Sequence, residues 1–136
     1  MKALSSSYSG YYNKGVDVTE EGGKLSGFTD AEIWTVGANG DGTFTFSTSD
    51  GKKLSMGASF TSMPLDDINT AWKISDAATE GCYYIENPAR GAYIEFQPGY
   101  GTWSGYYNIN DEALFAQKIY VIGGNTEPEK PVEPEE

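Results

Sequence analysis

The sequence contains no histidine and only one cysteine, Cys82. Without histidine the chain lacks the usual general base, the commonest metal ligand and the Ser-His-Asp triad. A single cysteine cannot form an internal disulfide, and Cys82 lies in a strand-like run where we expect it to pack as a small hydrophobe. These absences argue against an enzyme. The sequence predicts no catalytic residue, no metal site and no cofactor.

Basic residues and long apolar runs are also scarce. Lysine and arginine together number 9 against 20 acidic residues, which gives a net charge of −11. Affinity for phosphate backbones comes from clustered basic side chains, so nucleic acid is not an expected partner. No apolar stretch is long enough to cross a bilayer, so membrane insertion is not expected either.

Glycine and aromatic residues are abundant by contrast. The chain has 17 glycines, its aromatic content is 14%, and it shows no long amphipathic helical pattern. This composition is typical of small all-β domains with many turns. A length of 136 residues leaves room for one domain with an ordinary core.

The two ends of the chain differ from the middle. Residues 1–7 show no clear pattern and are expected to form an N-terminal extension. Residues 124–136 alternate proline with glutamate and predict a stiff, solvated linker to a further, covalently joined module. A single all-β binding domain is therefore expected over residues 8–123.

An internal repeat runs through this domain, with copies that begin at Trp34 and Trp72. In each copy, apolar residues follow a first glycine by two and four positions and a second glycine by three and five positions. This period of two, with glycine at the turns, predicts short antiparallel strands. Trp34 and Trp72 occupy equivalent positions, so both are expected to lie in the core.

A third copy begins at residues 116–119, which echo residues 71–74, and then the chain runs out. The N-terminus could supply the missing strands and so close the fold. Three such units predict a compact antiparallel β-barrel with a β-trefoil-like arrangement. A two-sheet sandwich is the alternative, since either closure protects the strand edges.

The most distinctive stretch for function is residues 96–108, where aromatic rings alternate with glycines. Glycines at this density argue against a regular buried strand, so the rings are either displayed on a loop or tucked beneath it. Displayed rings with polar edges suit sugars, whose C–H bonds stack on the ring while amides bond the hydroxyls. The predicted ligand-binding residues are Tyr100, Trp103, Tyr107, Gln97 and Asn108.

Two points about this site stay open from the sequence. Trp103 could pin the loop to the barrel or face a ligand, and the residues do not decide between these roles. An alternative aromatic surface comprises Phe60 with Tyr8, Tyr11 and Tyr12 from the N-terminal region.

The repeat pattern, from tryptophan through glycine-bounded aromatic pairs, resembles that of ricin-type lectin domains over residues 32–122, although Gln117 replaces the third tryptophan. The runs 72–74, 83–87, 90–96 and 103–104 are also similar to non-catalytic modules of secreted multidomain proteins of gut Firmicutes. These resemblances imply an accessory role in an extracellular or cell-surface protein.

The sequence therefore favours a non-catalytic module that binds a polysaccharide or oligosaccharide, with starch-like glucans as one expected ligand. The alternative is a structural or protein-interaction module that docks or spaces a neighbouring catalytic domain. Exposure of the loop aromatics separates the two, because buried rings would remove the basis for sugar binding.

Overall fold

The computed structural model describes residues 2–9 and 12–120. Its regular elements are nearly all short β-strands, joined by turns and loops, with one 3-10 turn and one four-residue helix. The strands are β1 (Lys2–Ser9), β2 (Tyr12–Asp17), β3 (Thr19–Glu21), β4 (Lys24–Ser26), β5 (Thr35–Ala38), β6 (Phe44–Ser47), β7 (Lys73–Asp76), β8 (Tyr83–Asn87), β9 (Ala92–Gln97) and β10 (Thr102–Tyr106), and the helical turns are η1 (Asp30–Glu32) and α1 (Glu112–Phe115). The all-β prediction is confirmed.

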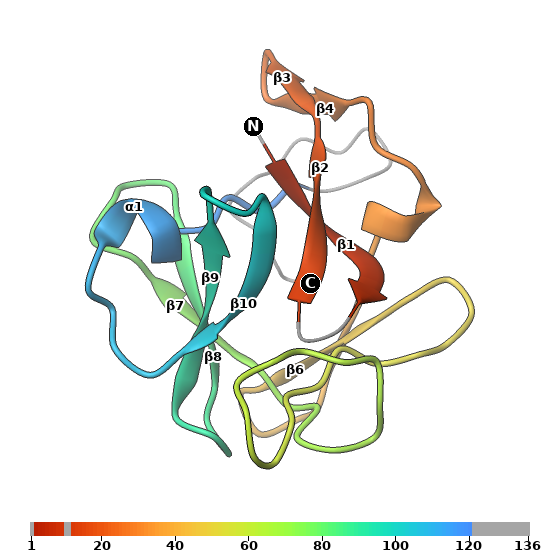
Figure 1. The fold of residues 1–136 in the computed structure, drawn as a ribbon, viewed down its shortest axis with the longest axis vertical. Helices are drawn as coiled ribbons and strands as arrows, with labels where there is room; N and C mark the ends of the chain where they lie inside the picture. Colours follow the sequence, from red (N-terminus) through yellow and green to blue (C-terminus); the bar gives the residue numbers. More distant parts are fainter. Residues whose placement is uncertain (1, 10–11, 121–136) are drawn as a thin grey trace.

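The strands form one six-stranded antiparallel sheet, in the order β1-β2-β10-β9-β8-β7, and two separate hairpins, β3-β4 and β5-β6. In Figure 1, β9 and β10 lie side by side in the middle of the molecule, with β2 and β1 to one side and α1 to the other. Within the part of the chain that the structure describes, no helix is long and apolar enough to span a membrane.

The predicted repeat appears as equivalent hairpins. In the first copy Val36 pairs with Phe46, and in the second Ile74 pairs with Ile85. The start of each following copy then bridges to the second strand of the hairpin before it, since Phe44 pairs with Trp72 and residue 83 pairs with residue 117. Gln117 therefore occupies the place in its copy that Trp72 occupies in the preceding one.

Side-chain hydrogen bonds repeat in the same way. The Trp72 indole donates to the carbonyl of Leu54 at 2.9 Å, and the Gln117 amide donates to the carbonyl of Ile94 at 3.1 Å. The Trp34 indole makes the third such bond, to the carbonyl of residue 4 at 3.0 Å. Because residue 4 lies in β1, the N-terminal strand completes the unit that begins at Gln117, as the sequence predicts.

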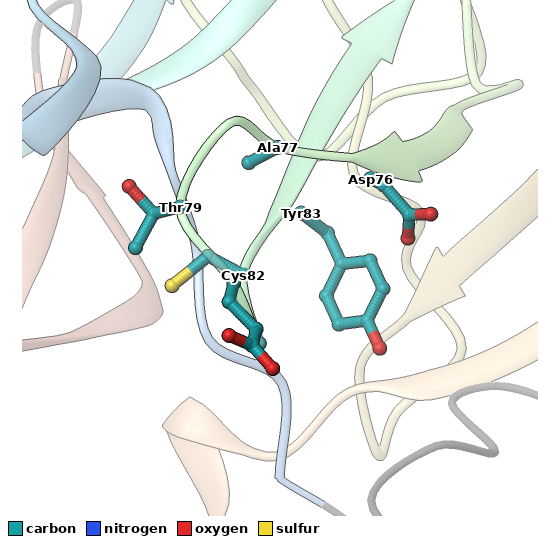
Figure 2. Close-up of a pocket in the computed structure, with 7 residues that line it drawn as sticks. Asp76, Ala77, Thr79, Cys82 and Tyr83 are labelled. Carbon is teal, nitrogen blue, oxygen red and sulfur yellow. The ribbon is translucent and has the colours of Figure 1, made fainter.

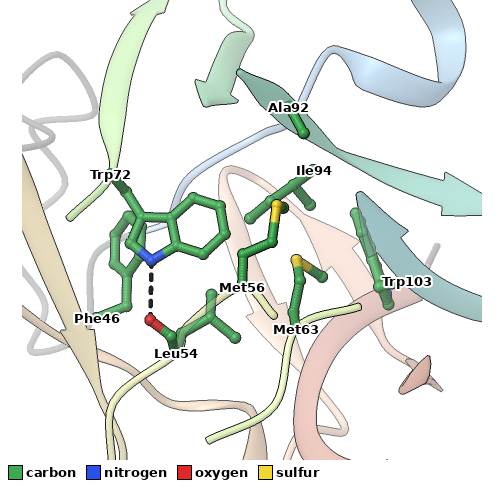
Figure 3. Packing of buried hydrophobic residues seen from close by; sticks show 8 residues of the cluster. All are labelled: Phe46, Leu54, Met56, Met63, Trp72, Ala92, Ile94 and Trp103. Carbon is green, nitrogen blue, oxygen red and sulfur yellow. Dashed lines mark hydrogen bonds between the residues drawn. The ribbon is translucent and has the colours of Figure 1, made fainter. Parts of the chain in front are cut away.

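The core lies where the copies meet. Trp72 is fully buried and tilts against Phe46, with ring centroids 6.3 Å apart. Figure 3 shows the Trp72–Leu54 bond together with the rest of the buried cluster, and Trp103 is part of that cluster. Trp34 is partly buried and packs on the edge of the same cluster. The prediction that Trp34 and Trp72 serve packing is confirmed.

The structure corrects the prediction that residues 1–7 form an N-terminal extension. Residues 2–9 form β1, which pairs along β2 with a register shift between Leu4 and Tyr8, and so belong to the domain. The strand is difficult to recognise in this serine-rich sequence because its apolar residues do not alternate with polar ones. It pairs with β2 because it completes the unit that begins at Gln117. The predicted linker over residues 124–136 lies outside the described residues.

Candidate functional site

The predicted binding loop is in fact built around a strand. Residues 102–106 form β10, which lies between β2 and β9 in the sheet. Its glycines serve the backbone: Gly101 has a φ of +66° in the β9–β10 turn, and Gly105 permits a close approach described below. The inference that this glycine density excludes a regular strand was wrong.

Tyr100 and Gln97 belong to the turn that precedes β10. The amide nitrogen of Tyr100 donates to the Gln97 carbonyl at 3.1 Å, and the tyrosine side chain is 80% exposed. The Gln97 side chain donates instead to the hydroxyl of Ser104 on β10 at 3.1 Å. The turn thus displays one isolated ring, and the amide expected beside it is already bonded.

The structure corrects the prediction that Trp103 binds the ligand. It is only 7% exposed and packs against Phe96 on the adjacent strand, with ring centroids 5.0 Å apart. A ring covered in this way offers no face to a sugar. Of the two roles that the sequence left open, burial favours the packing role.

The C-terminal end of β10 is held by more side-chain contacts. Tyr107, directly after the strand, is 48% exposed, and its hydroxyl accepts a 2.9 Å hydrogen bond from Arg90. The Arg90 guanidinium carbon lies 5.9 Å from the centre of the Tyr107 ring, and its Nε donates to the Gly57 carbonyl at 2.8 Å. Arg90 therefore joins the β8–β9 turn, the end of β10 and the loop 57–62.

That loop is also joined to β10 directly. The amide of Gly105 donates to the Thr61 carbonyl at 2.8 Å, and the Thr61 hydroxyl donates back to the Gly105 carbonyl at 2.6 Å. A Cβ on Gly105 would stand 2.5 Å from the Met56 methyl carbon and 2.7 Å from the Thr61 carbonyl oxygen. The close approach places Phe60, which is 62% exposed, beside the end of β10.

We call this region the β10-end surface. Its members are side chains next to the end of β10, on the β8–β9 turn and on the loop 57–62: Phe60, Arg90, Tyr107 and Asn108. Asn108 is exposed. Tyr106 is 44% exposed, but it lies opposite Tyr93 of β9 and so points to the other face of the sheet from Gly105, which lies opposite the buried Ile94. Among the predicted residues, only Tyr107 and Asn108 lie here.

Arg90 was not among the predicted site residues, and Phe60 was predicted to lie on an alternative surface. One signal for Arg90 was available, because it is the only arginine in the chain. Of the other residues on that alternative surface, Tyr12 is exposed and Tyr8 is partly buried, whereas Tyr11 lies outside the described residues.

A shallow pocket of about 290 Å³ lies at the β7–β8 turn. In Figure 2, Asp76 and Tyr83 lie on one side of the turn and Thr79 and Cys82 on the other. Cys82 is buried, and the other polar side chains that line the pocket are the carboxylates of Asp76 and Glu80 and the hydroxyls of Thr79 and Tyr83. Thiolate chemistry needs a positive charge or a base beside the sulfur, so this lining does not favour nucleophilic catalysis.

The pKa values of Glu95 and Glu112 are shifted in opposite directions. Burial raises the pKa of Glu95, whose Oε1 has no partner among the described residues. Hydrogen bonds from the Tyr84 hydroxyl and from Thr79 hold the pKa of Glu112 below its usual value. Within the described residues, no group of three or more acidic or cysteine side chains could hold a metal ion.

Comparison with known proteins identifies the fold. No protein-family model and no curated protein matches the chain. Among solved structures, the apo form of the BEL β-trefoil is similar, with a TM-score of 0.57 and 12% identity over 85% of this chain and 89% of that one. Hisactophilin, described as similar to interleukin-1β and fibroblast growth factor, gives a TM-score of 0.53 and 17% identity over 88% of this chain and 98% of its own. The chain therefore has a β-trefoil-like fold.

Proposed function

We propose that this protein is a non-catalytic carbohydrate-binding module of an extracellular or cell-surface protein, and that the β10-end surface binds the sugar. One observation carries the proposal. Phe60 and Tyr107 are both substantially exposed and lie on the two segments that meet where Gly105 bonds to Thr61, and Arg90 links Tyr107 to the loop that carries Phe60. Large exposed rings grouped in this way mark a binding surface.

The surface offers both kinds of contact that a sugar needs. The rings give apolar faces on which sugar C–H groups can stack, and the tyrosine hydroxyl gives a polar edge. The exposed amide of Asn108 and the guanidinium of Arg90 can bond the hydroxyls around the ring. Few polar groups at fixed positions beside apolar faces are typical of small-molecule sites.

The surface is also held in place before any ligand binds. Arg90 fixes the position of Tyr107, and the paired hydrogen bonds between Thr61 and Gly105 fix the loop that carries Phe60. Ordering side chains on binding costs free energy, so a preformed surface loses less of its affinity to that cost.

A polysaccharide could extend beyond this surface. The five residues of β10 span about 17 Å, and Tyr100 and Gln97 lie at the far end of that strand. These two residues stay predicted contacts for a long chain. Tyr100 is expected to contribute less than Tyr107, because it stands alone on its turn.

The second candidate function is a protein-interaction module that docks a neighbouring domain. The exposed aliphatic side chains of Val36 and Ile68 favour it, because a sugar site has no need of them. Such residues are common singly on surfaces, however, and these two lie outside the aromatic group.

Affinity electrophoresis of the full chain through gels that contain soluble polysaccharides tests the proposal. The panel should include a starch-like glucan, other neutral glucans and acidic polysaccharides, with bovine serum albumin as the unretarded reference. Retardation by at least one polysaccharide is the expected result. Unchanged migration across the panel would overturn sugar binding and leave the docking role.

A further inference from the structure

Arg90 has an unusual position for the only arginine in an acidic protein. The chain carries 20 acidic residues, yet the one ion pair among the residues that the structure describes joins Lys2 to Asp17. Arg90 instead donates to a backbone carbonyl, that of Gly57, and to the Tyr107 hydroxyl, both neutral acceptors. Its charge therefore has no carboxylate partner within the described part of the chain.

The guanidinium also keeps donors free. It has five N–H groups, and its two hydrogen bonds use one on Nε and one on Nη2. Its third nitrogen, Nη1, makes no hydrogen bond within the described residues and is not a buried atom, so it is accessible to solvent. Arg90 is thus a cation held by two hydrogen bonds, with its guanidinium carbon 5.9 Å from the centre of an exposed ring and its Nη1 donors accessible to solvent.

From this arrangement we infer that the β10-end surface selects sugars that carry a carboxylate, that is, uronic acid units in an acidic polysaccharide. The inference rests on the proposed function and specifies its ligand class. A planar guanidinium matches a planar carboxylate with two parallel N–H···O bonds, which are stronger and more directional than bonds to neutral hydroxyls. The ring of the same sugar would stack on Tyr107 or Phe60.

The negative charge of the whole protein does not prevent this recognition. At physiological ionic strength the Debye length is about 8 Å, so distant carboxylates on the protein act weakly on a ligand held at Arg90. A carboxylate bound at Arg90 would contact the guanidinium directly. Its attraction to this one charge would therefore be stronger than the screened repulsion from distant carboxylates of the protein.

A matched pair of ligands isolates the carboxylate. Polygalacturonate and its methyl ester have the same backbone, but only the first is charged. The full chain should bind polygalacturonate at least tenfold more tightly than the ester in low salt. The ratio should fall as sodium chloride is raised, because salt screens charge pairs at an exposed site.

Two variants assign the effect to Arg90. Arg90→Gln should reduce the preference for polygalacturonate to near unity. Arg90→Lys, which keeps the charge but loses the planar fork, should retain only part of it. Lys73→Gln is the control for loss of any one positive charge, and it should leave the preference unchanged. Circular dichroism melts of each variant show whether the fold is intact.

The outcomes separate this inference from the proposed function. Equal affinity for the two ligands, or binding to neutral glucans alone, would overturn selection of carboxylates while sugar binding stands. A carboxylate preference that survives Arg90→Gln in a folded protein would overturn the assignment to Arg90. Binding to none of the polysaccharides would overturn both.

Discussion

Gln117 donates its side-chain amide to the carbonyl of Ile94, the bond that the Trp72 indole makes with Leu54 in the preceding repeat. Glutamine thus preserves the N–H donor of the replaced tryptophan, although it does not supply the aromatic ring. The same amide also donates to the Leu114 carbonyl at 3.1 Å, which ties the last copy to the end of α1.

This relationship predicts that Gln117→Leu destabilises the domain. The substitution introduces an apolar side chain of similar size and leaves the carbonyls of Ile94 and Leu114 without their donor, at a cost of about 1–3 kcal/mol. Urea unfolding measures the loss. Lys118→Ala, at the exposed neighbouring position, is the control and should stay within about 0.5 kcal/mol. Equal stability of the two variants would refute the bonding role of Gln117.

Trp72 and Trp103 provide a second test of hydrogen bonding in the core. Both are buried, but only Trp72 has a partner for its indole nitrogen among the described residues. Replacing either with phenylalanine removes the same atoms. Trp72→Phe also leaves the Leu54 carbonyl unpaired, so it should cost about 1 kcal/mol more than Trp103→Phe in urea unfolding. A larger loss for Trp103→Phe would contradict this assignment.

Gly105 is required by the approach of the loop 57–62. An added methyl group would meet the Met56 side chain and the Thr61 carbonyl, so Gly105→Ala should destabilise by about 1–3 kcal/mol. Gly99→Ala is the matched control, because a Cβ there would meet nothing within 4 Å. Thermal melts compare the two. Equal melting temperatures for the two variants would show that the close contact at Gly105 does not constrain stability.

The shifted carboxyl groups predict opposite pH effects. Glu95 has a raised pKa in the fold, so its favourable contribution is complete below its unfolded pKa and is lost as pH rises through the folded value. Glu95→Gln should therefore raise the melting temperature at about pH 7 and have little effect at about pH 3. A variant that is less stable at neutral pH would contradict the desolvation of Glu95.

Glu112 provides the comparison of opposite sign. Its pKa is lowered in the fold, so its contribution is present above the unfolded pKa and is lost as pH falls through the folded value. Glu112→Gln should lower the melting temperature at about pH 7, with a smaller difference in acid. An unchanged neutral-pH melt would show that the contacts of Glu112 with Tyr84 and Thr79 do not stabilise the fold.

The fold could be predicted from sequence because the spacing of glycines and apolar residues along the chain repeats. Glycine turns and period-two apolar residues located the hairpins, and the echo at Gln117 indicated that the N-terminus closes the fold. The strand at residues 2–9 could not be recognised locally, since its pairing depends on β2 and on the unit that it completes.

The site was predicted less well, for a physical reason. The glycine at residue 105 was interpreted as evidence for a loop and against a regular buried strand, whereas it allows contact with Thr61, a residue far away in the sequence. Trp103 is buried by the same central position of β10. Tyr100 is exposed, as the ligand-binding role predicted for it requires, but the grouping of Tyr107 with Phe60 and Arg90 arises only from tertiary contacts.

The most direct test compares Tyr107→Ala with Tyr100→Ala in affinity electrophoresis, on whichever polysaccharide retards the unmodified chain. Tyr107→Ala should weaken binding at least tenfold, as truncation of a stacking ring at a binding centre costs about 2 kcal/mol. Tyr107→Phe keeps the ring and should lose less, and Tyr100→Ala should have the smallest effect. Unchanged affinity for Tyr107→Ala, with loss for Tyr100→Ala, would contradict the account and place the site on the β9–β10 turn.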